Sequence, residues 1–283
     1  MTTTWLDLPA TPALPGLFAR AAVRRGVRGQ TLPDLGLRCA VNVEAKKLGR
    51  YRQLCGLNDD GHLPPVYPHI LAFPLQMQLL TDSSFPFPLL GLVHLENRIR
   101  GVRPLGGMGP FIASVHVDNL QPHEKGAVFS LVTRLEDQLG LLWEGDSRIL
   151  CRGVKLSGQP AERSEEITLP LEDIAHWQAP ADIGRRYAAV AGDYNPIHLS
   201  ALSAKLFGFP RAIAHGLWNK GRALAALGER LPASGYVVDV RFQKPVLLPS
   251  AVTLQASNPA SSGQFKLVGN HDVPHMSGSW RLI

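Results

Sequence analysis

The sequence is poor in cysteine and has no long apolar run. These two features argue against a disulfide-bonded secreted protein and against a membrane-spanning one. Only three of its 283 residues are cysteines, Cys39, Cys55 and Cys151, and none has CxxC spacing. An odd, scattered set is typical of reduced thiols in the cytosol rather than of a disulfide framework. No stretch approaches the roughly 18 to 20 uninterrupted apolar residues of a transmembrane helix. The N-terminus lacks a secretory layout as well, so we expect a cytoplasmic protein that makes no use of a membrane.

The remaining composition is ordinary for a globular protein, with an excess of positive charge. The hydrophobic fraction of 45% is enough for one large core or two cores of about 140 residues each. The formal net charge of +6 favours anionic ligands, such as small molecules that carry phosphates. Nucleic acid is the competing partner, but the basic residues are spread along the chain and no RNA-recognition module is present. We therefore expect a small anionic ligand and no nucleic acid.

The segment Gly-Asp-Tyr-Asn-Pro-Ile-His, residues 192–198, places a carboxylate and an imidazole five positions apart across a turn. Pro196 fixes its own φ and disfavours helical geometry at Asn195, so Asp193 and His198 can face one pocket. Asp and His are the usual pair for moving protons near neutral pH. The alternative is a plain turn, because Gly, Asp, Asn and Pro are all common turn residues.

The two halves of the chain repeat one order of elements. Each reads as a strand, a helix, a buried helix and four strands, judged from β-branched runs, glycine stops and apolar stretches. The predicted ranges are 38–43, 45–54, 70–80, 90–100, 111–120, 127–135 and 141–151 in the first half, and 167–171, 182–191, 216–227, 236–242, 252–256, 264–269 and 276–282 in the second. The pattern indicates an α+β fold that is duplicated. The polar segment 153–166 is the natural linker.

Two stretches of the second half carry a family resemblance. Residues 187–198, with Ala204 six positions later, resemble the signature of (R)-specific enoyl-CoA hydratases in the MaoC-like dehydratase family. Ala191 stands where the family usually has Ser, Thr, Gly or Cys, and alanine is small enough to keep the backbone path. Residues 212–217, Ala-Ile-Ala-His-Gly-Leu, are similar to the family stretch whose glycine amide binds the thioester oxygen.

The resemblance implies a double hot-dog fold, in which two tandem antiparallel sheets each wrap around a central helix. Residues 1–152 and 167–283 are then the two hot-dog domains, and only the second is complete. Residues 51–62 align on 187–198 without a gap, so that His62 matches His198 but Leu57 stands in the place of Asp193. Ile70 falls where Gly216 supplies its amide. We infer that the first domain is a degenerate copy that forms a wall for the acyl chain.

The resemblance also implies the chemistry, which is the interconversion of (R)-3-hydroxyacyl and trans-2-enoyl thioesters. Asp193 and His198 share one water, and Asn195 holds that water or orients the pair. The Gly216 N–H, at a helix start where the dipole is positive, stabilises the enolate oxygen. His215 fixes the local backbone through a hydrogen bond. We expect neither a metal nor a redox cofactor.

The partner implied is an acyl-CoA or an acyl carrier protein, and a homodimer is left open. Four basic residues near the signature, Lys205, Arg211, Lys220 and Arg222, are candidates for coenzyme A phosphates, although solvated surface charge is the commoner explanation for any one of them. Trp218 either narrows the tunnel or packs in the core. A hot-dog thioesterase and a non-catalytic acyl-thioester-binding subunit are the rival functions.

Overall fold

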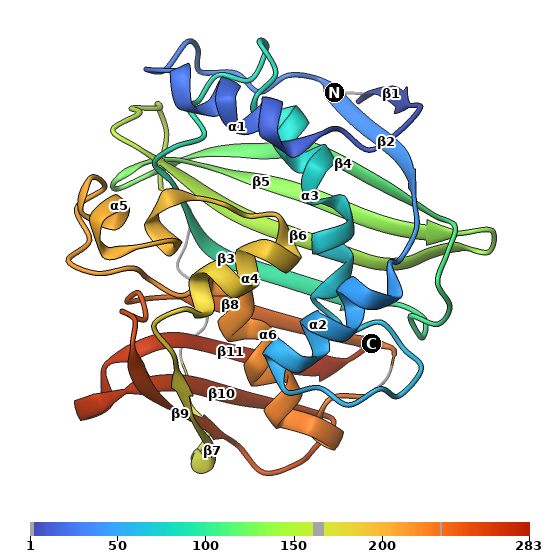
Figure 1. The fold of residues 1–283 in the computed structure, drawn as a ribbon, viewed down its shortest axis with the longest axis vertical. Helices are drawn as coiled ribbons and strands as arrows, with labels where there is room; N and C mark the ends of the chain where they lie inside the picture. The colour runs from blue at the N-terminus through green and yellow to red at the C-terminus, as the bar shows by residue number, and fades with distance from the viewer. Residues whose placement is uncertain (1–2, 161–166, 233) are drawn as a thin grey trace.

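The computed structural model describes residues 3–160, 167–232 and 234–283, and their strands form one continuous sheet (Figure 1). Eleven strands are hydrogen-bonded in the order β1-β2-β4-β5-β6-β3-β8-β11-β10-β9-β7 within these residues. The first half contains β1 (Thr4–Leu8), α1 (Leu14–Val23), β2 (Leu35–Val41), α2 (Ala45–Cys55), α3 (Tyr67–Leu80), β3 (Leu92–Gly101), β4 (Phe111–His123), β5 (Gly126–Asp137) and β6 (Gly140–Arg152). The second half contains β7 (Glu172–Ala179), α4 (Ile183–Ala191), the 3-10 turn η1 (Pro196–His198), α5 (Ala201–Lys205), α6 (Gly216–Leu227), η2 (Gly228–Arg230), β8 (Tyr236–Phe242), β9 (Ser250–Ala256), β10 (Ser262–Gly269), η3 (Asn270–Asp272) and β11 (Pro274–Leu282).

The strand order confirms that the fold is duplicated. The first half runs β2-β4-β5-β6-β3 and the second runs β7-β9-β10-β11-β8, which is the same arrangement strand for strand. The halves join through the antiparallel pair of β3 and β8, where Glu96 lies opposite Arg241 and Gly101 opposite Tyr236. The two tandem sheets expected from the sequence are thus fused into one. The extra strand β1 pairs parallel with β2 at one edge.

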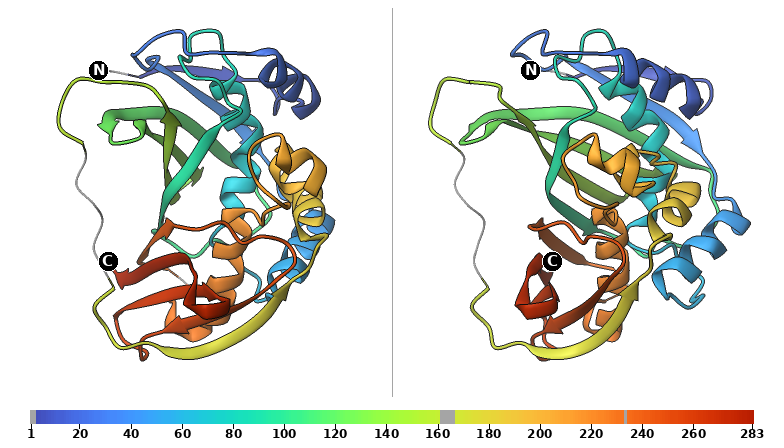
Figure 2. Two further views of the ribbon diagram at one scale, coloured as in Figure 1. Left: turned by 90° about the vertical axis from the view of Figure 1, so that its left-hand side faces the viewer. Right: turned by 60° about the vertical axis from the view of Figure 1, so that its left-hand side comes forward.

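Helices α3 and α6 are the central helices, and the sheet curves around them on one side (Figures 1 and 2). In α3, ten of the 14 residues are buried. A helix that is apolar on all sides is stable only inside a core, which explains why α3 is enclosed. Helix α6 is also mostly buried, even though Asn219 and Lys220 lie along it. No described helix combines the length and the apolarity needed to cross a bilayer.

Three expectations from the sequence need correction. The strand predicted at 167–171 is wrong, because the N–H groups of Thr168 and Leu169 donate to the Gln264 side chain and the edge strand β7 begins only at Glu172. Helix α3 begins at Tyr67 rather than Ile70. Strand β1 and helix α1 were not predicted at all. Residues 161–166 of the expected linker lie outside the described residues, and the division into domains 1–152 and 167–283 stays a prediction.

Candidate active site

A cavity of about 450 Å³ lies between the two halves and contains the signature residues. Asp193, Asn195, His198 and Gly216 all line it, as do His215 and Tyr187 from the same half. The opposite wall comes from the first half: Phe18, His69, Phe73, Met77, Leu80 and His94. Most of this wall is apolar. The cavity therefore joins an acid–base group on one side to a hydrophobic surface on the other.

Asp193 is placed by the end of helix α4. Gly192 ends the helix in the left-handed region, with φ of 80°, and the chain turns there toward the cavity. The Asn195 N–H donates to Asp193 Oδ1 at 3.2 Å, and the Asn195 side chain accepts from the Ile197 N–H at 3.4 Å. Asn195 thus caps η1 and orients the carboxylate through its main chain. Of the two roles suggested for Asn195, holding the water or orienting the acid–base pair, these contacts fit the second.

Gly184 is a residue that the sequence reasoning missed. It lies within α4, and a Cβ at this position would collide with the carbonyl oxygen of His198. The η1 turn can therefore approach the helix only because residue 184 has no side chain. The available signal was a glycine inside a predicted helix, which is costly unless another segment packs closely there.

The ring of His198 is buried, and its hydrogen bond defines which nitrogen carries the proton. Its Nδ1 lies 2.8 Å from the Ile213 carbonyl oxygen, which can only accept, so Nδ1 carries the proton and the Nε2 of the neutral ring is a base. Burial, with a smaller contribution from His215, lowers the pKa of His198 to about 3, against the opposing effect of Asp193. Burial also raises the pKa of Asp193, opposed by His198 and by the Asn195 N–H. The two groups are matched for moving a proton, because the imidazole is neutral and the carboxylate is more basic than usual.

His215 contacts both members of the pair. Its Nε2 lies 3.0 Å from the Asp193 carbonyl oxygen, which is the backbone contact expected of it. Its ring stacks on His198 with centroids 3.6 Å apart and an interplanar angle of 24°. Burial lowers the pKa of His215 to about 4. Both rings are therefore neutral near pH 7.

Asp193, His198 and His215 also form a group whose metal-ligating atoms all lie within 4.8 Å of one another. A tetrahedral zinc ion needs ligand lone pairs that converge at about 2.0 Å. The in-plane lone pairs of two stacked, nearly parallel rings do not converge, and Nδ1 of His198 is already used by Ile213. The geometry fits proton transfer better than metal binding.

Gly216 is the first residue of α6, and its N–H has no acceptor within the described part of the chain. Such a free amide at a helix N-terminus is a site for a negatively charged oxygen. A Cβ at Gly216 would lie 3.0 Å from Cε1 of Phe242. Glycine therefore keeps the amide accessible beside the Phe242 ring, which also lines the cavity.

None of the five proposed substrate-binding residues lines the cavity, and three of them are packed inside the protein or against it. Lys220 is fully buried and its Nζ donates to Asn97, so its assignment to a coenzyme A phosphate is wrong. Trp218 is also buried, and its Nε1 donates to the Leu54 carbonyl oxygen rather than narrowing the tunnel. Arg222 packs over the Trp177 ring at 5.1 Å. All three side chains turn away from the cavity because both halves of the protein surround α6.

The other two basic candidates are exposed. Lys205 and Arg211 are solvent-accessible and lie outside the cavity wall, so their contact with a phosphate stays a prediction. Two exposed basic residues do line the cavity, Arg152 and Lys244. Neither residue could be predicted from the sequence, because Arg152 ends β6 and Lys244 follows β8, and only the fold brings these positions to the cavity.

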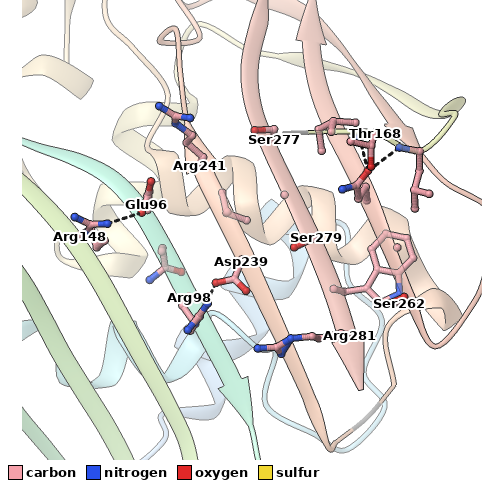
Figure 3. Close-up of a pocket in the computed structure, with 18 of the residues that line it drawn as sticks. Glu96, Arg98, Arg148, Thr168, Asp239, Arg241, Ser262, Ser277, Ser279 and Arg281 are labelled. Carbon is pink, nitrogen blue, oxygen red and sulfur yellow. Dashed lines mark hydrogen bonds and ion pairs between the residues drawn. The ribbon is translucent and has the colours of Figure 1, made fainter. Parts of the chain in front are cut away.

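A larger hollow of about 700 Å³ lies on the other face of the sheet (Figure 3). Glu96 and Arg98 point into it, while Asn97 between them points to α6, as expected from strand alternation. Its charges largely neutralise one another: Arg98 donates to Asp239 at 2.6 Å, and Arg148 lies 3.5 Å from Glu96. No histidine or cysteine lies among its described lining residues. This hollow lacks the acid–base pair that the inner cavity has.

The fold and the site together define a hot-dog protein with an acid–base pair and a free helix-start amide in a cavity between its two halves. Residues 154–273 match the family model described as a MaoC like domain. The chain is 36% identical over 214 residues to 3-hydroxyacyl-thioester dehydratase X of Mycobacterium tuberculosis, which covers 75% of this chain and 76% of that protein. The chain belongs to the MaoC-like dehydratase family.

Solved structures show the same architecture. The crystal structure of HtdX of Mycobacterium tuberculosis superposes with a TM-score of 0.77 at 30% identity, covering 88% of this chain and 100% of that one. A second Mycobacterium tuberculosis protein, described as a double hot-dog, has a TM-score of 0.56 at 10% identity and covers 93% of this chain and 98% of that one. The second likeness concerns the fold alone. The double hot-dog predicted from the sequence is confirmed.

Proposed function

We propose that this protein interconverts trans-2-enoyl and (R)-3-hydroxyacyl thioesters by adding or removing water. The observation that carries the proposal is the convergence of Asp193, His198 and the Gly216 amide on one cavity. Its family membership supports a hydratase or dehydratase of acyl thioesters, and the signature at 187–198 supports the (R) configuration. The thioester lies with its carbonyl at Gly216 and its acyl chain along the wall formed by the first half.

The chemistry needs one water. In hydration, the Asp193 carboxylate accepts one proton of the water, and Nε2 of His198 accepts a hydrogen bond from the other O–H. The water oxygen bonds to C3 while the C2=C3 double bond opens and charge moves to the thioester oxygen, where the Gly216 N–H stabilises it. The proton on Asp193 then passes to C2. A single amide donor of this kind contributes about 3 to 4 kcal/mol to lowering such a barrier.

The hydrophobic part of the cavity supports an acyl chain as the group bound there. Phe73, Met77 and Leu80 lie on one side of α3 and face the cavity, while Phe18 reaches it from α1. A carbon chain placed there gains about 0.8 kcal/mol for each buried methylene. This gives the first half, which has Leu57 in the position of a catalytic acid, a defined part in substrate binding.

Incubation with crotonyl-CoA tests the proposal. We expect the absorbance of the conjugated thioester to fall as 3-hydroxybutyryl-CoA forms, and chiral chromatography of the hydrolysed product to show the (R) isomer. A thioesterase would release free coenzyme A without forming the hydroxy product. A binding subunit would retain the ligand with no turnover, and either result would refute the proposal.

A further inference from the structure

Helix α6 is tied to the first half of the protein by three side chains. Trp218 Nε1 donates to the Leu54 carbonyl oxygen at 3.0 Å, and an Arg222 guanidinium nitrogen donates to that of Cys55 at 3.0 Å. Lys220, between them, donates to Asn97 of strand β3. The same helix carries Gly216 at its start. The first half, which lacks a residue equivalent to Asp193, therefore fixes the position of the helix that carries the free Gly216 amide.

The Lys220 contact is the most deeply buried of the three. The residue has no exposed surface, and its Nζ lies 2.8 Å from the Asn97 carbonyl oxygen, 2.7 Å from Asn97 Oδ1 and 3.4 Å from the Val238 carbonyl oxygen. Burial lowers the pKa of Lys220 well below its ordinary value, whereas the three oxygen acceptors around Nζ match the three N–H groups of the protonated form. Burying such a group is costly unless its hydrogen bonds are all made. Lys220 therefore has a structural role in the interior, in which all of its hydrogen bonds are made within the protein.

The position of Lys220 relates it to the amide and to the junction of the halves. It follows Gly216 by four residues, which puts it on the same face of α6, about 6 Å further along the axis. Its partners Asn97 and Val238 belong to β3 and β8, the two strands that join the half-sheets. The Asn97 side chain is held in turn by Ser147 Oγ at 3.1 Å on strand β6. A shift of α6 along its axis would break these contacts.

We propose that Lys220 is a positioning residue, which through Asn97 holds helix α6 in the register that aims the Gly216 amide at the thioester oxygen. The inference rests on the proposed function, since it assigns the amide to the enolate oxygen. It predicts that losing the contact lowers kcat, because the amide acts chiefly on charge that develops in the transition state. The KM should change little, because the acyl wall is formed by other residues.

The test uses two variants and a control. Lys220→Met together with Asn97→Leu removes both partners, so that no unpaired charge remains buried; Ser147 Oγ loses its contact with Asn97, and the protein is expected to stay folded. We expect kcat for crotonyl-CoA to fall at least about tenfold with KM within about twofold. Asn97→Asp keeps an acceptor for the ammonium and should keep kcat within about threefold. Trp143→Phe, which removes the hydrogen bond from Trp143 Nε1 to the Pro65 carbonyl oxygen and involves neither Lys220 nor Asn97, is the control for lost stability.

Two results would overturn the inference. One is a stable double variant with wild-type kcat, and the other is a kcat loss equal to that of a Trp143→Phe protein of the same melting temperature. Amide hydrogen exchange over residues 216–219 gives a readout that does not depend on activity: the double variant should exchange faster there, and unchanged exchange would refute the contact's role. If the wild type turns over no enoyl thioester, the proposed function fails, and the exchange measurement still decides whether Lys220 holds the helix.

Discussion

The imidazole rings of His198 and His215 are stacked, with centroids 3.6 Å apart and an angle of 24° between their planes. A proton on either ring would place a charge against the other in a buried site, and His215 indeed contributes to lowering the pKa of His198. Burial, with a smaller contribution from this contact at His198, therefore keeps both rings neutral in the range in which Asp193 is ionised. It leaves Nε2 of His198 as a base and Asp193 as the group whose ionisation controls activity.

The pH dependence of activity should reflect Asp193. Because burial raises its pKa above the ordinary value of 3.8, kcat/KM should fall as the pH drops through that raised value and the carboxylate is protonated. His198, with a pKa of about 3, should add nothing above pH 4. A pH–rate profile with crotonyl-CoA checks this. An acid limb centred near 6.5 would show instead that a histidine ionises, contrary to the burial of both rings.

Removing either member of the acid–base pair should strongly reduce turnover. Asp193→Asn and His198→Ala should each lower kcat by a factor of at least about a hundred, the scale of positioned acid–base groups. His62→Ala is the matched control, because His62 is the aligned histidine of the first half and its side chain is 44% exposed. It should retain wild-type rates. Near-normal turnover in both site variants would refute the assignment.

A methyl group at Gly216 should block the amide. The new Cβ would lie 3.0 Å from Cε1 and 3.2 Å from Cδ1 of Phe242, so either the ring or the helix must shift. We expect Gly216→Ala to lower kcat about tenfold or more and Phe242→Leu to restore part of the loss in the double variant. Gly49→Ala, in helix α2 with open space at its Cβ, is the control and should be active. Full activity of Gly216→Ala would contradict the role of this amide.

A carboxylate in the first half should not create a second site. Leu57 packs against the core, and the first-half helix begins with Tyr67 and Pro68 instead of a glycine with a free amide. The variant Leu57→Asp combined with Asp193→Asn should therefore be as inactive as Asp193→Asn alone, as measured with crotonyl-CoA. New turnover in the double variant would refute the interpretation of the first half as a degenerate copy.

Stability should depend on pH through His94, which lines the cavity from the first half. Burial, with smaller contributions from His69 and Lys220, lowers its pKa to about 3. The folded pKa lies below the unfolded value of 6.5, so the stability linked to a neutral His94 is complete above pH 6.5 and is lost as the pH falls. His94→Leu should make unfolding less pH-dependent by up to roughly 1.4 kcal/mol per pH unit between pH 6 and 4. The free energy of unfolding, measured in urea at each pH, would contradict this if it changed with pH by the same amount in the two proteins.

The sequence predicted the order of elements well, because each strand and helix carries its own local pattern. The β-branched run of residues 236–242 coincides with β8, and Gly192 does end α4. The Asp193–His198 pair could also be predicted from the sequence, since both residues lie in one short turn. Strand β1 is short, pairs with β2 alone among the described strands, and has no comparable pattern.

The direction in which side chains point could not be predicted from the sequence, because it depends on packing between segments far apart in the chain. Trp218 and Lys220 reach residues of the first half that are more than 100 positions away. His94 faces the cavity because the register of β3 against β6 shifts between His94 and Glu96, which reverses the alternation of side chains at that point. No periodicity of one strand reveals such a shift.

The most direct test of the central claim is a crystal structure of the Asp193→Asn variant with (R)-3-hydroxybutyryl-CoA bound. The account predicts the thioester oxygen within hydrogen-bond distance of the Gly216 N–H, and the C3 hydroxyl between residue 193 and His198 Nε2. It also predicts the acyl chain against the wall formed by α3. A thioester bound in the outer hollow of Figure 3, or in the inner cavity with its carbonyl away from Gly216, would contradict it.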